Sequence, residues 1–225
     1  MKKEDVSSRN LFDLSHTEAG PLFNRYQYPW EVLPEIKAFI LSLGASLSAE
    51  EYEHPQEDVW IHKTAKVFPS AYIKGPCIIG AETEVRHCAF IRGAVLVGKN
   101  CVVGNSTELK NVILFDNVQV PHYNYVGDSV LGYKAHMGAG SITSNVKSDK
   151  LPVKVHLGSG DGDIETGLKK FGAVLGDFVE VGCGSVLNPG TVIGAHTNIY
   201  PLSSVRSAVQ GNSIYKKQGE VAEKQ

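Results

Sequence analysis

The feature of this sequence that most constrains its fold is a six-residue repeat of aliphatic residues. From Ile61 to Leu109 an aliphatic residue occupies every sixth position, and the same period returns from Leu175 to Val205. Four positions after each of these residues the chain carries a mostly small residue. A period of six matches neither the 3.6-residue period of an amphipathic helix nor the two-residue alternation of a single strand.

A six-residue unit fits a strand of a few residues followed by a turn. Three such units close a triangular coil of about eighteen residues, and stacked coils form a solenoid with parallel backbone hydrogen bonds. The aliphatic residue would fill the narrow interior, and the small residue would lie where the chain bends. Each buried aliphatic side chain contributes roughly 1.5–3 kcal/mol relative to exposure. We therefore predict an all-β solenoid, a parallel β-helix of hexapeptide repeats.

Two segments depart from this repeat in the middle of the chain. Between about 114 and 144 the register slips but persists, whereas residues 145–170 interrupt it. The interrupting segment is long and polar and contains the sequence GSGDGD, which is typical of a flexible tip. We expect an excursion from the solenoid, with a hairpin as one form that it can take. Long excursions on rigid scaffolds tend to carry function.

The first 58 residues lack the repeat and contain helical patterns. Apolar residues from Trp30 to Leu43 follow helical spacing, and Gly44 marks the end. Ser48 and Glu51 form a capping-box pattern for a second short helix. We predict that residues 1–58 cap the open first coil of a β-helix at 59–210, and that 211–225 form a C-terminal tail.

Composition excludes several classes of function. The chain carries 22 basic and 24 acidic side chains, which argues against a nucleic-acid partner or a polybasic membrane anchor. Its first residues, MKKEDVSSRNLFDLS, lack the apolar core expected of a secretion signal, and there is no apolar run of about 18 residues. Its four cysteines show no paired spacing for a metal or redox site, which favours reduced thiols. We expect a cytoplasmic protein with no membrane partner.

The segment from residue 103 carries more specific motifs, PHYNYVGD at 121–128 and GAGSITSN at 138–145. With KKFGAVLGD at 169–177, it resembles the acetyltransferase domain of bifunctional glucosamine-1-phosphate acetyltransferase / N-acetylglucosamine-1-phosphate uridyltransferase, over roughly residues 85–206. The resemblance implies a left-handed helix, a homotrimer, and acetyl-CoA in a groove between neighbouring prisms. It also implies a place in nucleotide-sugar metabolism around UDP-N-acetylglucosamine. The period alone gives no handedness.

The resemblance implies catalytic roles for His122 and Asn145. His122 coincides with the family's general base, and Asn145 with an asparagine that orients the amino sugar. An amino sugar is largely protonated at neutral pH, and attack on a thioester needs the free amine. Histidine, whose ordinary pKa is near 6.5, is suited to accept that proton. Without the motif, His122 would read as a hydrogen-bonded surface histidine.

The resemblance also implies an acceptor site of Arg92, Lys110, Tyr125 and Lys170. Arg92 and Lys110 would hold the phosphate end of the sugar, as guanidinium and ammonium groups commonly do. The alignment of Lys170 depends on the insertion before it. His136 replaces a family asparagine, so it could alter acceptor choice or serve as a second base. Further departures are Val146 in place of a tyrosine and the longer excursion.

On the donor side, the resemblance implicates Ala139, Cys183, Lys216 and Lys217. The backbone at Ala139 would contact the thiol end of coenzyme A, and N–H groups there could stabilise an oxyanion. Cys183 stands where the family usually has serine, and direct transfer needs no covalent nucleophile. Lys216 and Lys217 could meet the phosphates of coenzyme A or belong to a solvated tail.

These residues predict a CoA-dependent acyltransferase that moves an acetyl group from acetyl-CoA to the amine of a sugar phosphate or nucleotide sugar. We expect no metal in catalysis and no nucleotidyltransferase domain, which 58 residues cannot hold. One alternative is a non-catalytic module that binds sugar phosphates or holds an oligomer together. Another is a γ-type carbonic anhydrase with three zinc-binding histidines. His87 and His122 invite that comparison, but Gly127 stands where the next ligand would fall.

Overall fold

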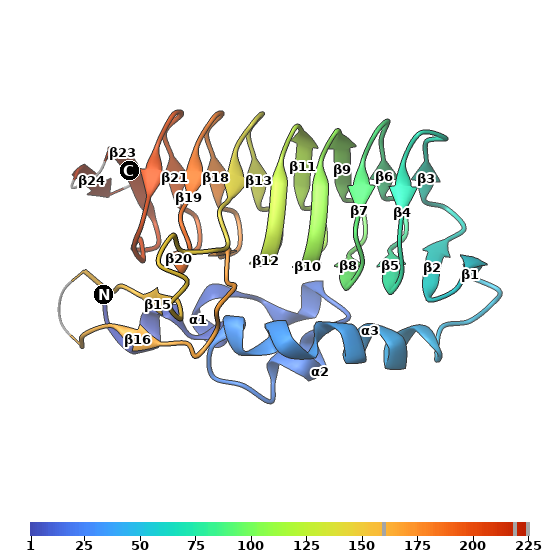
Figure 1. The fold of residues 1–225 in the computed structure, drawn as a ribbon, viewed down its shortest axis with the longest axis horizontal. Helices are drawn as coiled ribbons and strands as arrows, with labels where there is room; N and C mark the ends of the chain where they lie inside the picture. Colours follow the sequence, from blue (N-terminus) through green and yellow to red (C-terminus); the bar gives the residue numbers. More distant parts are fainter. Residues whose placement is uncertain (159–160, 218–219, 224–225) are drawn as a thin grey trace.

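The computed structural model describes residues 1–158, 161–217 and 220–223. Short parallel strands stack coil upon coil into a left-handed β-helix with three faces, as the repeat and the resemblance predict (Figure 1). Figure 1 also shows a layer of helices along one side of the prism. Within the described ranges, no helix is both long and apolar enough to span a membrane.

Each face of the prism is a ladder of short strands, because each six-residue repeat contains both a strand and a turn. The covered face, named for the helices over it, consists of β2 (Val59–His62), β5 (Cys77–Ile79), β8 (Val95–Val97), the second halves of β10 (Glu108–Leu114) and β12 (Tyr125–Leu131), β17 (Ala173–Leu175) and β20 (Thr191–Ile193).

The other two faces have no helices over them. The polar face consists of β3 (Lys66–Val67), β6 (Glu84–Val85), β9 (Val102–Asn105), β11 (Gln119–His122), β13 (His136–Met137), β18 (Glu180–Val181), β21 (Asn198–Ile199) and β23 (Ser213–Lys217), with β24 (Glu220–Glu223) antiparallel to β23. The open face consists of β4 (Tyr72–Ile73), β7 (Phe90–Ile91), the first halves of β10 and β12, β14 (Ile142–Thr143), β19 (Val186–Leu187) and β22 (Ser204–Val205).

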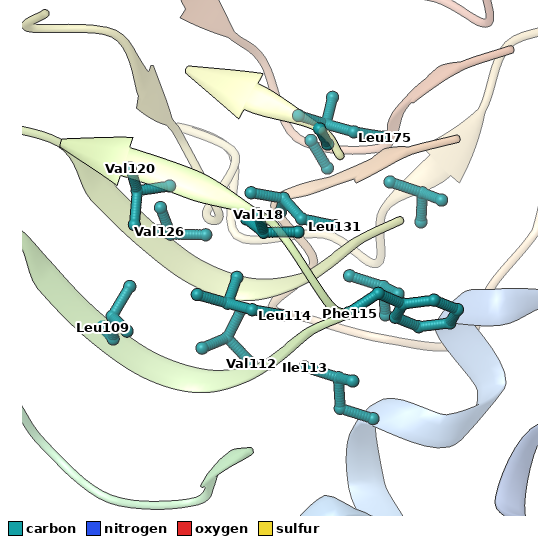
Figure 2. Packing of buried hydrophobic residues seen from close by; sticks show 14 of the residues in the cluster. Leu109, Val112, Ile113, Leu114, Phe115, Val118, Val120, Val126, Leu131 and Leu175 are labelled. Carbon is teal, nitrogen blue, oxygen red and sulfur yellow. The ribbon is translucent and has the colours of Figure 1, made fainter. Parts of the chain in front are cut away.

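The interior of the prism is filled by the residues of the repeat. Leu109 ends the first clean register in the interior, and Leu114, Val120 and Val126 of the slipped register continue the same core (Figure 2). Groups on neighbouring coils are usually 18 residues apart, but only 17 apart where Asn111 contacts the corner of the next coil. The register slip is therefore a shortening of two coils by one residue, and the stacking is unbroken.

The N-terminal segment forms the side layer. It comprises η1 (Lys3–Val6), α1 (Ser8–Leu11), η2 (Leu14–His16), α2 (Gly20–Phe23), η3 (Pro29–Glu35) and α3 (Ile36–Gly44), followed by β1 (Tyr52–Gln56), which is antiparallel to β2. Beneath the layer, the middle residue of each covered-face strand from β5 onward points outward and is apolar and buried. These residues are Ile78, Leu96, Ile113, Val130, Val174 and Val192.

The helices of the N-terminal segment do not lie over the first coil as expected, although β1 of the same segment pairs with β2 at the edge of that coil. The helices run along the covered face, with α3 against β5, β8 and β10 (Figure 1). Accordingly, Ile61, Val67 and Ile73 at the first coil remain partly exposed. The prediction of a second short helix is also wrong, because the chain makes a single turn at Ser48 and enters β1. The helices therefore bury the apolar residues on the outside of one face in preference to the open end of the first coil.

The excursion contains a hairpin, as expected. Strands β15 (Lys154–Val155) and β16 (Ile164–Glu165) pair antiparallel, while residues 159–160 of the expected flexible tip lie outside the described residues. Val155 and Leu157 are buried, and the N-terminal amine of Met1 donates to the carbonyl of Leu157 at 3.0 Å. The hairpin therefore rests on the N-terminal layer. Around it the coils remain stacked, since Ser129 hydrogen-bonds Ala173, which is 44 residues away in sequence.

Candidate active site

A buried aspartate organises the corner between the open and the covered face. Asp128 is only 3% exposed and has a φ of 47° where β12 turns this corner. Its carboxylate accepts hydrogen bonds from Lys110 Nζ at 3.0 Å, from Asn111 Nδ2 at 3.0 Å and from Asn145 Nδ2. A buried carboxylate needs such donors and a cation to offset its lost hydration. Asp128 thereby fixes the positions of Lys110 and Asn145.

Tyr125 joins this cluster from the open face. Asn145 Nδ2 donates to its hydroxyl oxygen at 3.2 Å. Burial raises the pKa of Tyr125, and the nearby carboxylates Asp128 and Glu108 raise it further. Gly127 leaves room for the ring, because a Cβ there would lie 2.5 Å from the tyrosine hydroxyl. The phenol therefore remains protonated and can donate a hydrogen bond to a ligand.

The two basic residues expected to clamp a phosphate are both paired with carboxylates. Arg92 lies one coil from Lys110, and its Nη1 is 2.7 Å from Glu108 Oε1. Its guanidinium also lies over the ring of Phe90, 5.9 Å from the ring centroid and within the reach of about 6 Å for cation–π contacts. Lys110 is bound to Asp128. The structure thus brings Lys110, Tyr125 and Asn145 together, with Arg92 beside them, but leaves little unbalanced positive charge.

His122 occupies the other edge of the open face, at its corner with the polar face. Its side chain is exposed, and among the described residues the imidazole has no hydrogen-bonding or charged partner. The carbonyl of His122 accepts from the amide of Gly140, and the carbonyl of Ala139 accepts from the amide of Gly184. These bonds place His122, Ala139 and Cys183 along one corner on successive coils. The expected base and two expected donor-site residues therefore share an edge.

The remaining candidates lie elsewhere. His136 projects from the polar face, where its Nδ1 is 2.8 Å from Glu180 Oε2. Lys170 is exposed at the end of the excursion. Lys216 and Lys217 belong to β23 at the C-terminal end of the prism, and Lys217 pairs with Glu220 at 3.0 Å (Figure 1). None of these four contacts the Asp128 cluster through an interaction between described residues.

The ligand set of a zinc enzyme is not assembled in the described part of the chain. His87 Nδ1 contacts Ser70 Oγ at 2.8 Å, one coil away. Over residues 1–158, 161–217 and 220–223, no group of three or more histidine, cysteine or acidic side chains could hold a metal ion. All four cysteines are free, and burial raises the pKa of Cys101 to about 12.

Asp128, Asn111 and Glu108 are site residues that the sequence reasoning missed. A usable signal was present for the first two. Asn and Asp tolerate the left-handed conformation better than most residues. They occur at the corner where the repeat shortens from 18 residues to 17. Glu108 offered no such signal, since an acidic residue on the outside of a strand is ordinary.

The stacked coils define the class, a hexapeptide-repeat protein that folds as a parallel β-helix. Within that class, residues 73–199 match the model of the GMPPB C-terminal domain, and the chain belongs to this family.

Two curated relatives show how far the likeness extends. The bifunctional protein GlmU of Methanococcus maripaludis strain S2 is 32% identical over 207 residues, covering 91% of this chain and 50% of the relative. The bifunctional sugar-1-phosphate nucleotidylyltransferase/acetyltransferase of Sulfurisphaera tokodaii is 31% identical over 177 residues, covering 70% and 43%. The resemblance inferred from the motifs is confirmed, and the chain spans about half the length of the curated relatives it matches.

Solved structures with similar coils are more distant. A hexapeptide transferase family protein from Anaplasma phagocytophilum is 16% identical, with a TM-score of 0.49 over 74% of this chain and 79% of that one. The acetyltransferase domain of PglB from Neisseria gonorrhoeae, solved with acetyl coenzyme A, is 16% identical, with a TM-score of 0.34 over 74% and 57%.

Proposed function

We propose that this protein is an N-acetyltransferase that uses acetyl-CoA and acts on the amine of an amino-sugar phosphate or nucleotide sugar. The observation that carries the proposal is the cluster of Tyr125, Asn145 and Lys110 around Asp128. It supplies fixed polar groups on one edge of the open face, and His122 lies on the opposite edge of the same face. The relative from Sulfurisphaera tokodaii, a nucleotidylyltransferase/acetyltransferase, supports the same class of reaction.

In the proposed reaction, Asn145 and Tyr125 orient the amino sugar at the open face. The amine nitrogen attacks the thioester carbonyl carbon, forming a C–N bond, while an imidazole nitrogen of His122 takes the proton that the nitrogen loses. A backbone N–H at Ala139 stabilises the oxyanion of the tetrahedral intermediate. The intermediate then collapses, the C–S bond breaks, and the proton passes from His122 to the departing thiolate. The products are the N-acetylated sugar and free coenzyme A.

The remaining assignments belong to the same proposal. Arg92 borders the acceptor beside Lys110, and Cys183 lies next to Ala139 on the donor edge without forming a covalent bond. His136, Lys170, Lys216 and Lys217 would act at the periphery of the groove. We also propose a homotrimer in the cytoplasm, working without a catalytic metal.

Thiol release tests the proposal. Glucosamine 1-phosphate and other amino-sugar phosphates are incubated with acetyl-CoA, and free thiol is titrated over time. We expect turnover by the wild type and a loss of about 10²–10⁴-fold in His122→Ala, the usual contribution of a general base. His87→Ala is the matched control, since this histidine lies on the same corner and its imidazole contacts Ser70 and Phe68. Equal loss in both variants would contradict a specific role for His122.

The non-catalytic module remains the second candidate, and one observation favours it. Arg92 and Lys110 are already paired, and the imidazole of His122 has no described group to orient it. This alternative predicts that sugar phosphates bind but release no thiol with any acceptor. Calorimetric binding measured beside the thiol assay separates the two functions.

A further inference from the structure

A cavity outside the Asp128 cluster has no role in the reaction described so far. It measures about 420 Å³ and lies between the excursion and the corner of the prism where Ser144, Asn188 and Arg206 follow one another on successive coils. Its volume falls within the range of small-molecule sites. Six of its ten lining residues belong to the excursion, so the cavity depends on this segment.

The lining of the cavity carries excess positive charge. Its cations are Lys147, Lys154 and Arg206, and its one carboxylate is Asp149. Lys147 pairs with that carboxylate at 3.0 Å, whereas Lys154 pairs with Glu165, which lies outside the lining. The lining also includes His156, whose Nδ1 is 2.7 Å from Asp163.

Arg206 differs from the other cations of this region. Among the residues that the structure describes, it makes no hydrogen bond, ion pair or ring contact, although its side chain is exposed beside the cavity. A guanidinium presents several donors in a fixed fork, a geometry that matches phosphate oxygens. Hydroxyl groups of Ser144 and Ser148 and the amide of Asn188 add polar groups to the same lining.

The cavity adjoins the candidate active site. Ser144 and Val146 both line it, and Asn145 between them belongs to the Asp128 cluster. Arg92 and Lys110, the cations expected to receive a phosphate, each face a carboxylate already. Among the cations of the lining, Arg206 is the one for which no partner is found in the described part of the chain.

We propose that this cavity binds a phosphate or diphosphate group of one reactant, with Arg206, Lys154 and Lys147 as its cationic partners. The proposal of an anion-binding site depends only on the cavity and its lining, whereas the identity of the reactant that carries the anion rests on the proposed function. A diphosphate could come from a nucleotide-sugar acceptor or from coenzyme A. The two sources share the same chemistry and are separated by the probes below.

Isothermal titration of the full chain with inorganic pyrophosphate, UDP and coenzyme A tests the site without any need for turnover. We expect pyrophosphate to bind the wild type, and Arg206→Gln to weaken that binding about tenfold, the effect of losing one charged hydrogen-bonding group. Lys37→Gln on α3 removes one positive charge far along the helical layer and serves as the matched control. No binding of pyrophosphate, or equal weakening in both variants, would overturn the site.

Asp149→Asn provides a test of opposite sign. The amide still offers an acceptor to the backbone N–H of Leu151 but removes the one negative charge of the lining. We expect pyrophosphate to bind about two- to threefold more tightly, the scale of an exposed ion pair. Weaker binding in this variant would contradict an anion site.

The source of the anion follows from the other two probes. If Arg206→Gln weakens UDP but leaves coenzyme A unchanged, the cavity holds the acceptor; the reverse pattern assigns it to the donor. Both patterns support the site. Failure of the proposed function is visible separately, as absent thiol release in a protein that still binds pyrophosphate through Arg206. Failure of the site alone is visible as turnover without such binding.

Discussion

The covered face and the open face belong to one prism but have opposite outer surfaces. On the covered face the outward residues are aliphatic, as Ile113 illustrates, and the N-terminal layer buries them completely. On the open face the outward positions include Tyr72, which is 60% exposed, and Tyr125, which belongs to the site. The six-residue repeat specifies the interior in the same way on all three faces. The outward residues therefore determine which face is covered by the N-terminal layer and which remains accessible to ligands.

The largest expected effect comes from breaking the covered face. Ile113→Ala removes a fully buried outward side chain between the prism and α3. We expect the free energy of unfolding to fall by about 2–5 kcal/mol, as in other large-to-small substitutions in cores. Tyr72→Ala at an exposed outward position should cost under about 1 kcal/mol. Urea denaturation followed by circular dichroism measures both, and equal losses would show that the helical layer adds no stability.

The second effect concerns the corner between the two faces. Asp128→Asn removes the negative charge that fixes Lys110 and Asn145 and leaves a group of the same size. If the proposed function holds, misplacement of Asn145 should lower kcat about 10²-fold, the effect of a small displacement in a reacting geometry. Thiol release against acceptor concentration gives kcat and KM separately.

A change in KM alone would instead show that Asp128 only helps to bind the acceptor. Asp128→Glu provides the partner variant, because it keeps the charge. Partial recovery of kcat in Asp128→Glu, with kcat still low in Asp128→Asn, would identify the charge as the important property. Equal loss in both would mean that the shape of this corner matters more than its charge.

The interior was predictable from sequence, whereas much of the exterior was not. A period of six has one simple solution, so Ile91 and Leu187 are buried as expected. The N-terminal layer was misplaced because the apolar outward residues recur once per coil, as at Ile78 and Leu96, and a search for the six-residue period passes over them. They are nevertheless a readable signal. A once-per-coil apolar residue outside the interior register predicts a face that another segment covers.

The candidate site shows the same division. Lys110, Tyr125 and Asn145 were placed by resemblance to a motif, and the structure brings them together. The motif gave no indication of Glu108 and Asp128, the carboxylates that pair with the basic residues of the site. Asp128 meets Lys110, 18 residues earlier, and Asn111, 17 residues earlier, and such pairings depend on how coils stack in three dimensions. Charges separated by a whole coil carry no local pattern.

The smallest expected effect distinguishes two buried aspartates on the two sides of the prism. Asp128 has the ammonium group of Lys110 as its partner. Asp177, on the side of the N-terminal layer, accepts backbone N–H groups of Asp13 and Tyr133, each at 2.7 Å. Burial raises the pKa of Asp177 above its ordinary value of 3.8, and the two backbone hydrogen bonds offset only part of that rise.

Because its pKa is raised on folding, Asp177 binds its proton more tightly in the folded chain than in the unfolded chain. The associated stability is complete below the ordinary pKa and is lost as pH rises through the folded value. We therefore expect the wild type to lose stability relative to Asp177→Asn as pH rises above about 4, an effect absent from the Asn variant. Urea midpoints of both proteins across this range measure the difference. A difference that stays constant with pH would mean that the two backbone amides fully replace the hydration that Asp177 loses, and that this side of the prism needs no cation where the open corner does.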